Sequence, residues 1–272
     1  MSERFRDRMD AGRQLGAKLA HLRGQNVIVL GLPRGGLAVG LEVARALHAP
    51  LDALNVRKLG VPWREELAMG AIATGGIRVL NSEIIMALGI TKEMIDETTT
   101  FQQMELDRRE QLYRHGKPAP ALQGRTVVLV DDGIATGATV RAAIGVVRAQ
   151  HAAKLVLATP VAQRSVVDEL QREVDELVCV STPGDLYAIG YWYDHFPQLS
   201  DADILRLIDD DKIEWRFTAG EMLRDAAEQL GPRDGAPLGQ ADAHTLEDRP
   251  QRLALGGHVE IEVAEDQQRR GK

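Results

Sequence analysis

Two adjacent carboxylates stand at the end of an apolar run in the middle of the chain. Asp131 and Asp132 directly follow Val127–Val130, and Gly133 comes next. An apolar, β-branched run of this kind is typical of a strand buried in the middle of a parallel sheet. At the end of such a strand, two carboxylates can accept hydrogen bonds from two neighbouring hydroxyl groups. The pair therefore predicts contacts to the vicinal hydroxyls of a sugar.

The residues after this pair have the composition of a phosphate-binding loop. A helical pattern starts at Gly137 and runs to about Gln150. Backbone N–H groups and hydroxyls at a helix N-terminus can hold a phosphate monoester, and a glycine lets the backbone approach the anion. If the aspartates only capped the helix, one Asp and one Thr would be explained but not the whole pattern. The residues predicted to hold the phosphate of a ribose 5-phosphate are Ala135, Thr136, Gly137, Ala138 and Thr139.

Strands and helices must alternate along the chain to position this loop. Strands are predicted at Val27–Leu30, Leu51–Val56, Thr126–Val130, Lys154–Thr159 and Glu176–Val180, with two short ones at Ala68–Ala73 and Gly76–Leu80. Helices are predicted at Leu37–His48, Thr91 to about Arg114, Gly137 to about Gln150 and Ser165–Arg172. The alternation indicates an α/β domain with a largely parallel sheet, whose ligands lie beyond the carboxyl ends of the strands.

A second glycine loop and a basic pair follow the first two predicted strands. Pro33-Arg34-Gly35-Gly36 comes before the helix at Leu37–His48, so its backbone N–H groups and Arg34 can face an anion. Arg57 and Lys58 begin the segment Arg57–Glu66, which is predicted to be a polar loop because Gly60 and Pro62 interrupt it. A plain turn and a solvated basic pair are the competing interpretations.

Composition limits the classes of function. The chain has 272 residues, and its formal net charge of −7 argues against general binding to nucleic acid or anionic membranes. A single cysteine rules out an intrachain disulfide, and no apolar run is long enough to span a bilayer. We expect a cytoplasmic protein with a main domain at 1–212 and an appendage at 213–272, which is poor in large apolar groups and partly disordered. Within the appendage, a helix is predicted at Glu221–Gln229 and a weakly alternating strand at His258–Val263.

The segment Val127–Thr139 resembles the loop that binds 5-phosphoribosyl 1-diphosphate (PRPP) in type I phosphoribosyltransferases. A Walker A loop would need a GK[ST] ending and a dinucleotide fingerprint would need GxGxxG, and this segment has neither. The resemblance covers about residues 10–210 and is closest to bacterial members of unassigned acceptor substrate. It implies a parallel sheet flanked by helices, with a small hood at about 182–196, and a homodimer is common among such proteins.

The resemblance also implies a reaction and a set of roles. Ribose 5-phosphate would pass from PRPP to a nitrogen nucleophile, a nucleobase by preference, and pyrophosphate would leave. Asp131 and Asp132 would be the catalytic pair, and Mg²⁺ would be the cofactor, held by this pair indirectly through ribose hydroxyls or water. The residues implied for pyrophosphate binding are Arg34, Gly35, Gly36, Arg57 and Lys58.

The acceptor is the part of the reaction that the motifs leave open. Hypoxanthine-guanine members commonly carry an Asp where this chain has Ala135, so an oxopurine acceptor is disfavoured. Glu65 or Glu66 is a candidate replacement base, although both would be ordinary surface residues on a loop. In the hood, Tyr191 and Trp192 are the candidate base contacts, with packing under the hood as the alternative.

Two other functions compete with an active transferase. A regulator could keep the PRPP pocket and respond to a nucleotide without turnover. A receiver-like module also has an Asp pair at strand ends, but it would need that pair after the first strand and a lysine near the end. The Asp pair here follows a strand far along the chain, with Thr-Gly-Ala-Thr behind it, which disfavours a receiver.

Overall fold

The computed structural model describes residues 4–74, 76–114, 118–210 and 259–263. A five-stranded parallel sheet forms its centre, with the strand order β2-β1-β6-β7-β8. Each strand matches one that the alternating pattern predicts, so the α/β class with a parallel sheet is confirmed. The strands are β1 Val27–Gly31, β2 Leu51–Ala53, β6 Thr126–Val130, β7 Lys154–Val161 and β8 Glu176–Ser181.

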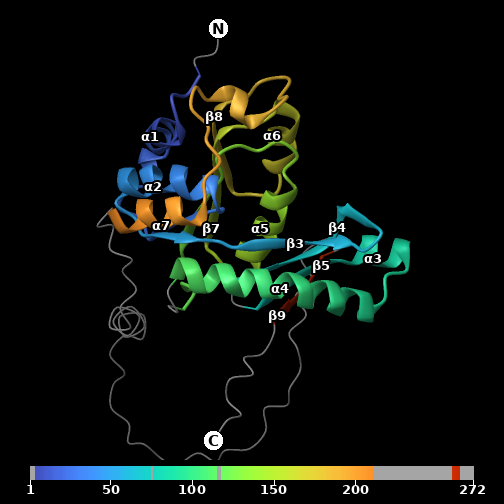
Figure 1. Ribbon diagram of the computed structural model, residues 1–272. Coiled ribbons are helices and arrows are strands. Elements are labelled where there is room, and N and C mark those ends of the chain that lie inside the picture. The colour runs from blue at the N-terminus through green and yellow to red at the C-terminus, as the bar shows by residue number, and fades with distance from the viewer. Residues whose placement is uncertain (1–3, 75, 115–117, 211–258, 264–272) are drawn as a thin grey trace, which may run out of the picture.

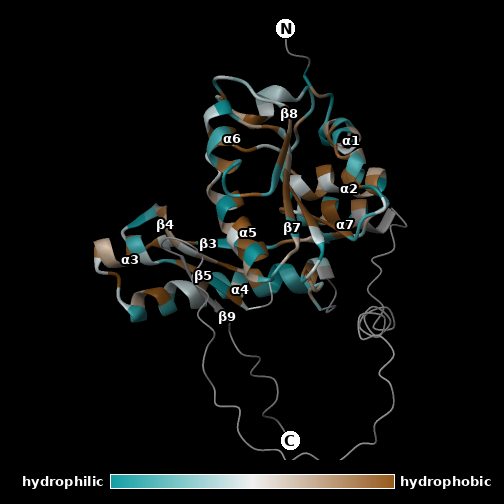
Figure 2. Cartoon of the chain, turned by 180° about the vertical axis from the view of Figure 1, so that it is seen from behind, coloured by the Kyte–Doolittle hydropathy of each residue, from teal (hydrophilic) through white to brown (hydrophobic). Residues whose placement is uncertain are grey.

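Helices cover both faces of this central sheet (Figure 1). Helices α1 (Arg8–Lys18), α2 (Gly35–Leu47) and α7 (Asp201–Asp210) pack on one face, and α5 (Ala138–Ala149) and α6 (Arg164–Leu170) pack on the other. Along β1, Val27 and Val29 pack with α1, α2 and α7 on the first face, and Ile28 and Leu30 pack with α5 and α6 on the second. Because both faces of the sheet are covered, its strands are largely apolar, as the brown strands in Figure 2 show.

A second, antiparallel sheet lies beside the first, in the order β3-β4-β5-β9. Its strands are β3 Val56–Val61, β4 Arg64–Ala73, β5 Ile77–Asn81 and β9 Val259–Val263. The long helix α4 (Lys92–Arg114) covers one face, where Leu59, Met69 and Ile72 pack with Ile95 and Leu106, and α3 (Ser82–Leu88) follows β5. The other face packs against α5 of the central domain. The second sheet therefore joins the core through α5.

The prediction of a loop at Arg57–Glu66 is wrong. This segment is the hairpin formed by β3 and β4, and the strand predicted at Leu51–Val56 is split, because β2 ends at Ala53 and β3 begins at Val56. A β-bulge at Gly60 shifts the register, and a β-carbon at Gly60 would overlap the backbone of Glu65. Gly60 thus permits a close backbone approach inside a strand pair, whereas glycine in a sequence usually indicates a turn.

Three helices were not predicted: α1, α3 and α7. Helix α1 shows why, since it packs closely on α2 through small residues and has few large apolar ones. A β-carbon at Gly12 would overlap the carbonyl of Val39, and one at Gly16 would overlap the side chain of Ala46. Because glycines make this helix contact, the sequence of α1 lacks the periodic apolar residues that usually indicate a helix.

The region after α7 is described only at β9. The weak strand predicted at His258–Val263 corresponds to β9, which pairs with β5. The helix predicted at Glu221–Gln229 and the rest of the 213–272 appendage lie outside the described residues. Among the helices that the structure describes, none is both long enough and apolar enough to cross a membrane.

Candidate functional site

The Asp pair lies against the start of α2. Strands β1 and β6 are hydrogen-bonded neighbours, so the loops that follow them meet at one edge of the sheet. A β-carbon on Gly35 would overlap the carboxylate of Asp132, and one on Gly36 would overlap the carbonyl of Val130. These glycines are needed for close approach. The structure thus brings together Asp131, Asp132 and the second glycine loop, in which the Pro33–Arg34 peptide bond is cis.

An arginine from the unpredicted helix α1 holds Asp132. Arg8 Nε donates to Asp132 Oδ2 at 2.7 Å, and the two side chains are only 10% and 14% exposed. The Arg8 guanidinium also lies 3.7 Å from the ring centre of Phe196 and donates to the carbonyl of Pro197. The hydroxyl of Tyr193 donates to the carbonyl of Asp132. Asp132 is therefore fixed from both its side chain and its backbone.

Burial shapes the charge of the two carboxyl groups. Burial raises the pKa of Asp131, and the neighbouring charge of Asp132 raises it further. Burial also raises the pKa of Asp132, against which the hydrogen bond and the charge of Arg8 act to lower it. Two carboxylates placed together out of water are costly unless hydrogen-bond donors approach them. Ligand hydroxyl groups would be such donors.

The predicted phosphate loop is open to solvent at the N-terminus of α5. Its exposed members are Ala135, Thr136, Ala138 and Thr139, and Gly137 is buried between them. Gly137 is the N-cap of α5 and has φ +77°, a left-handed conformation that glycine adopts without strain. The backbone N–H of Ile134 donates to the carbonyl of Val161, which anchors the loop to β7. The conformation leaves helix N–H groups available for an anion.

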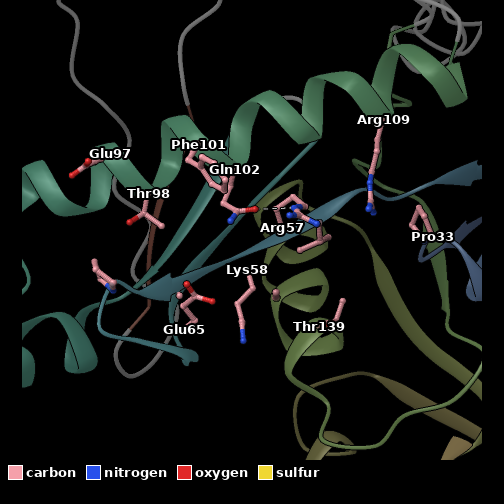
Figure 3. Close-up of a pocket in the computed structure, with 14 residues that line it drawn as sticks. Pro33, Arg57, Lys58, Glu65, Glu97, Thr98, Phe101, Gln102, Arg109 and Thr139 are labelled. Atoms are coloured by element: carbon pink, nitrogen blue, oxygen red, sulfur yellow. Dashed lines mark hydrogen bonds between the residues drawn. The ribbon is translucent and has the colours of Figure 1, made fainter. Parts of the chain in front are cut away.

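A cleft of about 770 Å³ opens beside this loop. Figure 3 shows α4 on one side of the cleft, β3 along it and the start of α5 with Thr139 opposite. Pro33 of the second glycine loop lies at one end, and Glu97 and Thr98 lie toward the other. The lining residues are Pro33, Val56, Arg57, Lys58, Gly60, Pro62, Glu65, Glu97, Thr98, Phe101, Gln102, Arg109, Thr139 and Ala142.

Cationic side chains line the cleft from its middle to the end at Pro33 (Figure 3). The predicted residues Arg57 and Lys58 both line it, and Arg57 Nε donates to Gln102 Oε1 at 2.9 Å. Arg109 of α4 also lines the cleft and donates from Nε to Glu105 at 2.8 Å. Arg109 was missed from the sequence because Glu105 and Arg109 have the spacing of an ordinary pair on a helix surface.

Arg34 and Arg57 line different openings beside the second glycine loop. Arg34 lines a smaller cavity of about 320 Å³ together with Arg8, Gly35 and the segment 196–199. Its Nη1 is 4.0 Å from Asp201 Oδ1, at the start of α7. The residues predicted to bind pyrophosphate are therefore divided between two openings that flank the loop 33–36, except for Gly36, which is buried.

The hood aromatics are only partly placed for ligand contact. Tyr191 is 71% exposed, whereas Trp192 is half-buried in a cluster with Phe5, Tyr193 and Phe196. None of them lines the 770 Å³ cleft, and Phe196 lines the smaller cavity. Of the two candidate bases, Glu65 lines the large cleft, and the side chain of Glu66 lies outside the described residues.

Asp131 and Asp132 are the residues that would hold a magnesium ion together with a substrate. Within the described ranges, there is no cluster of three or more histidine, cysteine or acidic residues that could hold a metal. Asp131 and Asp132 supply two carboxylates, and one of these is already paired with Arg8. Mg²⁺ commonly binds through one or two carboxylates together with substrate phosphates and water.

Comparison with known proteins points to one family. A family model described as the phosphoribosyl transferase domain matches residues 7–189. A Mycobacterium tuberculosis protein, found in two strains under the provisional name phosphoribosyl transferase, is 48% identical over 205 residues. This match covers 75% of the present chain and 46% of the relative, so the chain spans about half the length of the curated relatives it matches.

A solved structure shares both sequence and fold with the chain. The protein TT1426 from Thermus thermophilus is 40% identical and has a TM-score of 0.70. The match covers 78% of the present chain and 99% of that crystal structure. The family match at residues 7–189 spans the parallel sheet and the loops that end its strands.

Proposed function

The chain belongs to the phosphoribosyl transferase family, and from this premise we propose that it transfers ribose 5-phosphate from PRPP to a nitrogen nucleophile, releasing pyrophosphate. One observation carries the proposal: the half-buried Asp pair lies between an exposed candidate phosphate loop and the glycine loop that starts α2. These three parts suit the ribose hydroxyls, the 5-phosphate and the diphosphate of one molecule.

The reaction separates charge at C1 of the ribose. As the bond to the diphosphate breaks, the sugar becomes cationic and the leaving group takes the electron pair. Asp131 and Asp132 accept hydrogen bonds from the ribose hydroxyls, and their negative charge stabilises the cationic ring. The 5-phosphate lies on the N–H groups of the loop 135–139, which fixes C1 relative to the Asp pair.

Donors on the glycine loop and on β3 stabilise the leaving group. The backbone N–H groups of Gly35 and Gly36 lie at the positive end of α2. Arg34, Arg57 and Lys58 supply charge from the two openings that flank this loop. A magnesium ion bound with PRPP would neutralise part of the diphosphate charge, with Asp131 and Asp132 holding it indirectly.

The acceptor is proposed to be a nucleobase other than an oxopurine. Ala135 removes the acid that hypoxanthine-guanine members commonly place at this position. Glu65 on the cleft wall is the proposed replacement proton acceptor. The proposed base contacts are Tyr191, which is exposed although the Arg4 guanidinium lies over its ring, and Trp192.

Pyrophosphate release tests the proposal. Wild type would be incubated with PRPP and Mg²⁺ across a panel of purines, pyrimidines and amines, next to Asp131→Asn/Asp132→Asn. We expect turnover with at least one acceptor and a loss of about two to three orders of magnitude in the double variant, as when charge-stabilising groups are removed from other sites. Equal turnover in both proteins would refute the role of the pair.

A PRPP-sensing regulator of the same fold is the second candidate. Ala135 favours it, because the phosphate loop lacks an acid/base residue, and Asp132 is already occupied by Arg8. Calorimetric binding of PRPP with Mg²⁺, without turnover of any acceptor in the panel, is the outcome that would select the regulator. No binding at millimolar PRPP would exclude both candidates.

A further inference from the structure

We propose that Arg109 of α4 is a donor-substrate residue that binds the diphosphate group of PRPP. No sequence motif indicates this role, and α4 belongs to the second sheet rather than to the central domain. The inference rests on the proposed function, because that function supplies a diphosphate as the ligand. It makes α4 a wall of the substrate site as well as a cover for the second sheet.

Arg109 lies at the end of the cleft where the glycine loop begins. Its side chain extends from α4 toward β3 and lies beside Pro33 of the glycine loop (Figure 3). Arg57 of β3 lies next to it, Lys58 lies farther along the strand near Glu65, and all three cations line the same cleft. The acidic lining residues Glu65 and Glu97 both lie farther from Pro33 than Arg109 does. Positive charge is therefore concentrated at the end nearest the loop that faces the leaving group.

Like charges packed this closely suit an anionic ligand. Burial and the neighbouring charge of Arg109 lower the pKa of Arg57, which shows that the two guanidinium groups repel each other. The chain as a whole carries a formal charge of −7, so a cationic cluster is not a general property of its surface. A polyanion between α4 and β3 would relieve this repulsion through charge-assisted hydrogen bonds.

Glu105 holds Arg109 in place without fully occupying it. The bond runs from Nε of Arg109 to one carboxylate oxygen at 2.8 Å, which leaves the two Nη groups for a ligand. Glu105 also accepts from Arg108, and both arginines lower its pKa to about 2, so it stays ionised. Arg108 is different, because it is 52% exposed and its Nη2 donates to Asp201. The two neighbouring arginines thus form a natural test and control.

The chemistry of the ligand separates Arg109 from the phosphate loop. PRPP has two anionic ends, and the loop 135–139 takes the 5-phosphate. A guanidinium beside Pro33 suits the diphosphate end, where a planar fork can bind phosphate oxygens in pairs. Ribose 5-phosphate lacks that end, so its affinity should not depend on Arg109.

Calorimetry with three ligands tests the assignment. Wild type, Arg109→Gln, Arg109→Lys and Arg108→Gln would each be titrated with inorganic pyrophosphate, PRPP and ribose 5-phosphate, all with Mg²⁺. In Arg109→Gln, we expect about tenfold weaker binding of pyrophosphate and PRPP, the loss typical of a charge-assisted contact. Ribose 5-phosphate should bind as to wild type. Arg109→Lys should be intermediate because it keeps the charge, and Arg108→Gln should match wild type.

The outcomes separate this inference from the function on which it rests. If Arg109→Gln binds pyrophosphate as wild type does, or loses ribose 5-phosphate equally, the role of Arg109 is wrong and the proposed function stands. If wild type binds neither PRPP nor pyrophosphate at millimolar concentration, both are wrong. Thermal unfolding checks that each variant is folded, and Arg109→Lys provides the comparison if Arg109→Gln is not.

Discussion

The two sides of the candidate site are constructed in opposite ways. At the edge of the central sheet, Asp131 and Asp132 are consecutive, half-buried residues, and Arg8 holds Asp132 in an ion pair. On the wall made by β3 and α4, the cationic residues Arg57 and Arg109 come from separate elements and face an open cleft. One side is part of the packed core, and the other is a charged surface.

This difference predicts different consequences of mutation. Groups buried at the sheet edge support folding as well as ligand binding, since removing one partner leaves another unpaired out of water. Removing a charged side chain from the cleft wall costs little folding stability, because water takes its place. We therefore expect changes at the sheet edge to affect stability, and changes on the wall to affect binding alone.

Arg8→Leu is the strongest test of this contrast. It leaves Asp132 unpaired in a buried position, and breaking a buried ion pair typically costs about 3–5 kcal/mol. Urea unfolding would measure the loss. Arg6→Leu is the matched control, because Arg6 forms an exposed pair with Asp10, and its unfolding midpoint should equal that of wild type. Equal midpoints for wild type and Arg8→Leu would break the comparison.

Gly35→Ala probes the contact between the two loops. The added β-carbon would overlap the Asp132 carboxylate, so the start of α2 must move away. Overpacking of this kind costs about 1–3 kcal/mol, and PRPP affinity should fall with it. Gly184→Ala has open space around the added carbon and should change neither quantity. Denaturant unfolding and calorimetry would report on both variants.

Arg57→Gln sharpens the comparison from the cleft wall. The variant removes one cation from the cluster while the strand pairing of β3 is kept, because the backbone makes those bonds. Affinity for pyrophosphate should fall about tenfold, and the unfolding midpoint should remain that of wild type. A large drop in stability would show that the wall, too, is part of the core.

The pH dependence of stability gives the smallest effect. Burial raises the pKa of Asp131 in the folded state. The contribution of Asp131 to stability is therefore full below its unfolded pKa of about 4 and is lost as pH rises through the raised folded value. Asp131→Asn removes this titration, so its unfolding free energy should fall less across that window in metal-free buffer. If the unfolding free energies of wild type and Asp131→Asn depend on pH in the same way, the pKa of Asp131 is not raised.

The central sheet could be predicted from the sequence because its signals are local. Five apolar runs, each followed by polar or glycine residues, correspond to β1, β2, β6, β7 and β8. The second sheet shows where this method fails. Gly60 and Pro62 suggested a loop at Arg57–Glu66, although backbone pairing with β4 makes Gly60 part of a strand. Helix α1 was missed because its contact with α2 uses Gly12 and Gly16.

By itself, the sequence identified the Asp pair, the candidate phosphate loop and the glycine loop, because each is a short run of neighbours in the chain. Tertiary structure alone decided the rest. Arg8 reaches Asp132 from a distant helix, and Arg109 meets Arg57 only when α4 packs on β3. Such contacts depend on how surfaces pack, and the one-dimensional spacing of residue types does not contain that information.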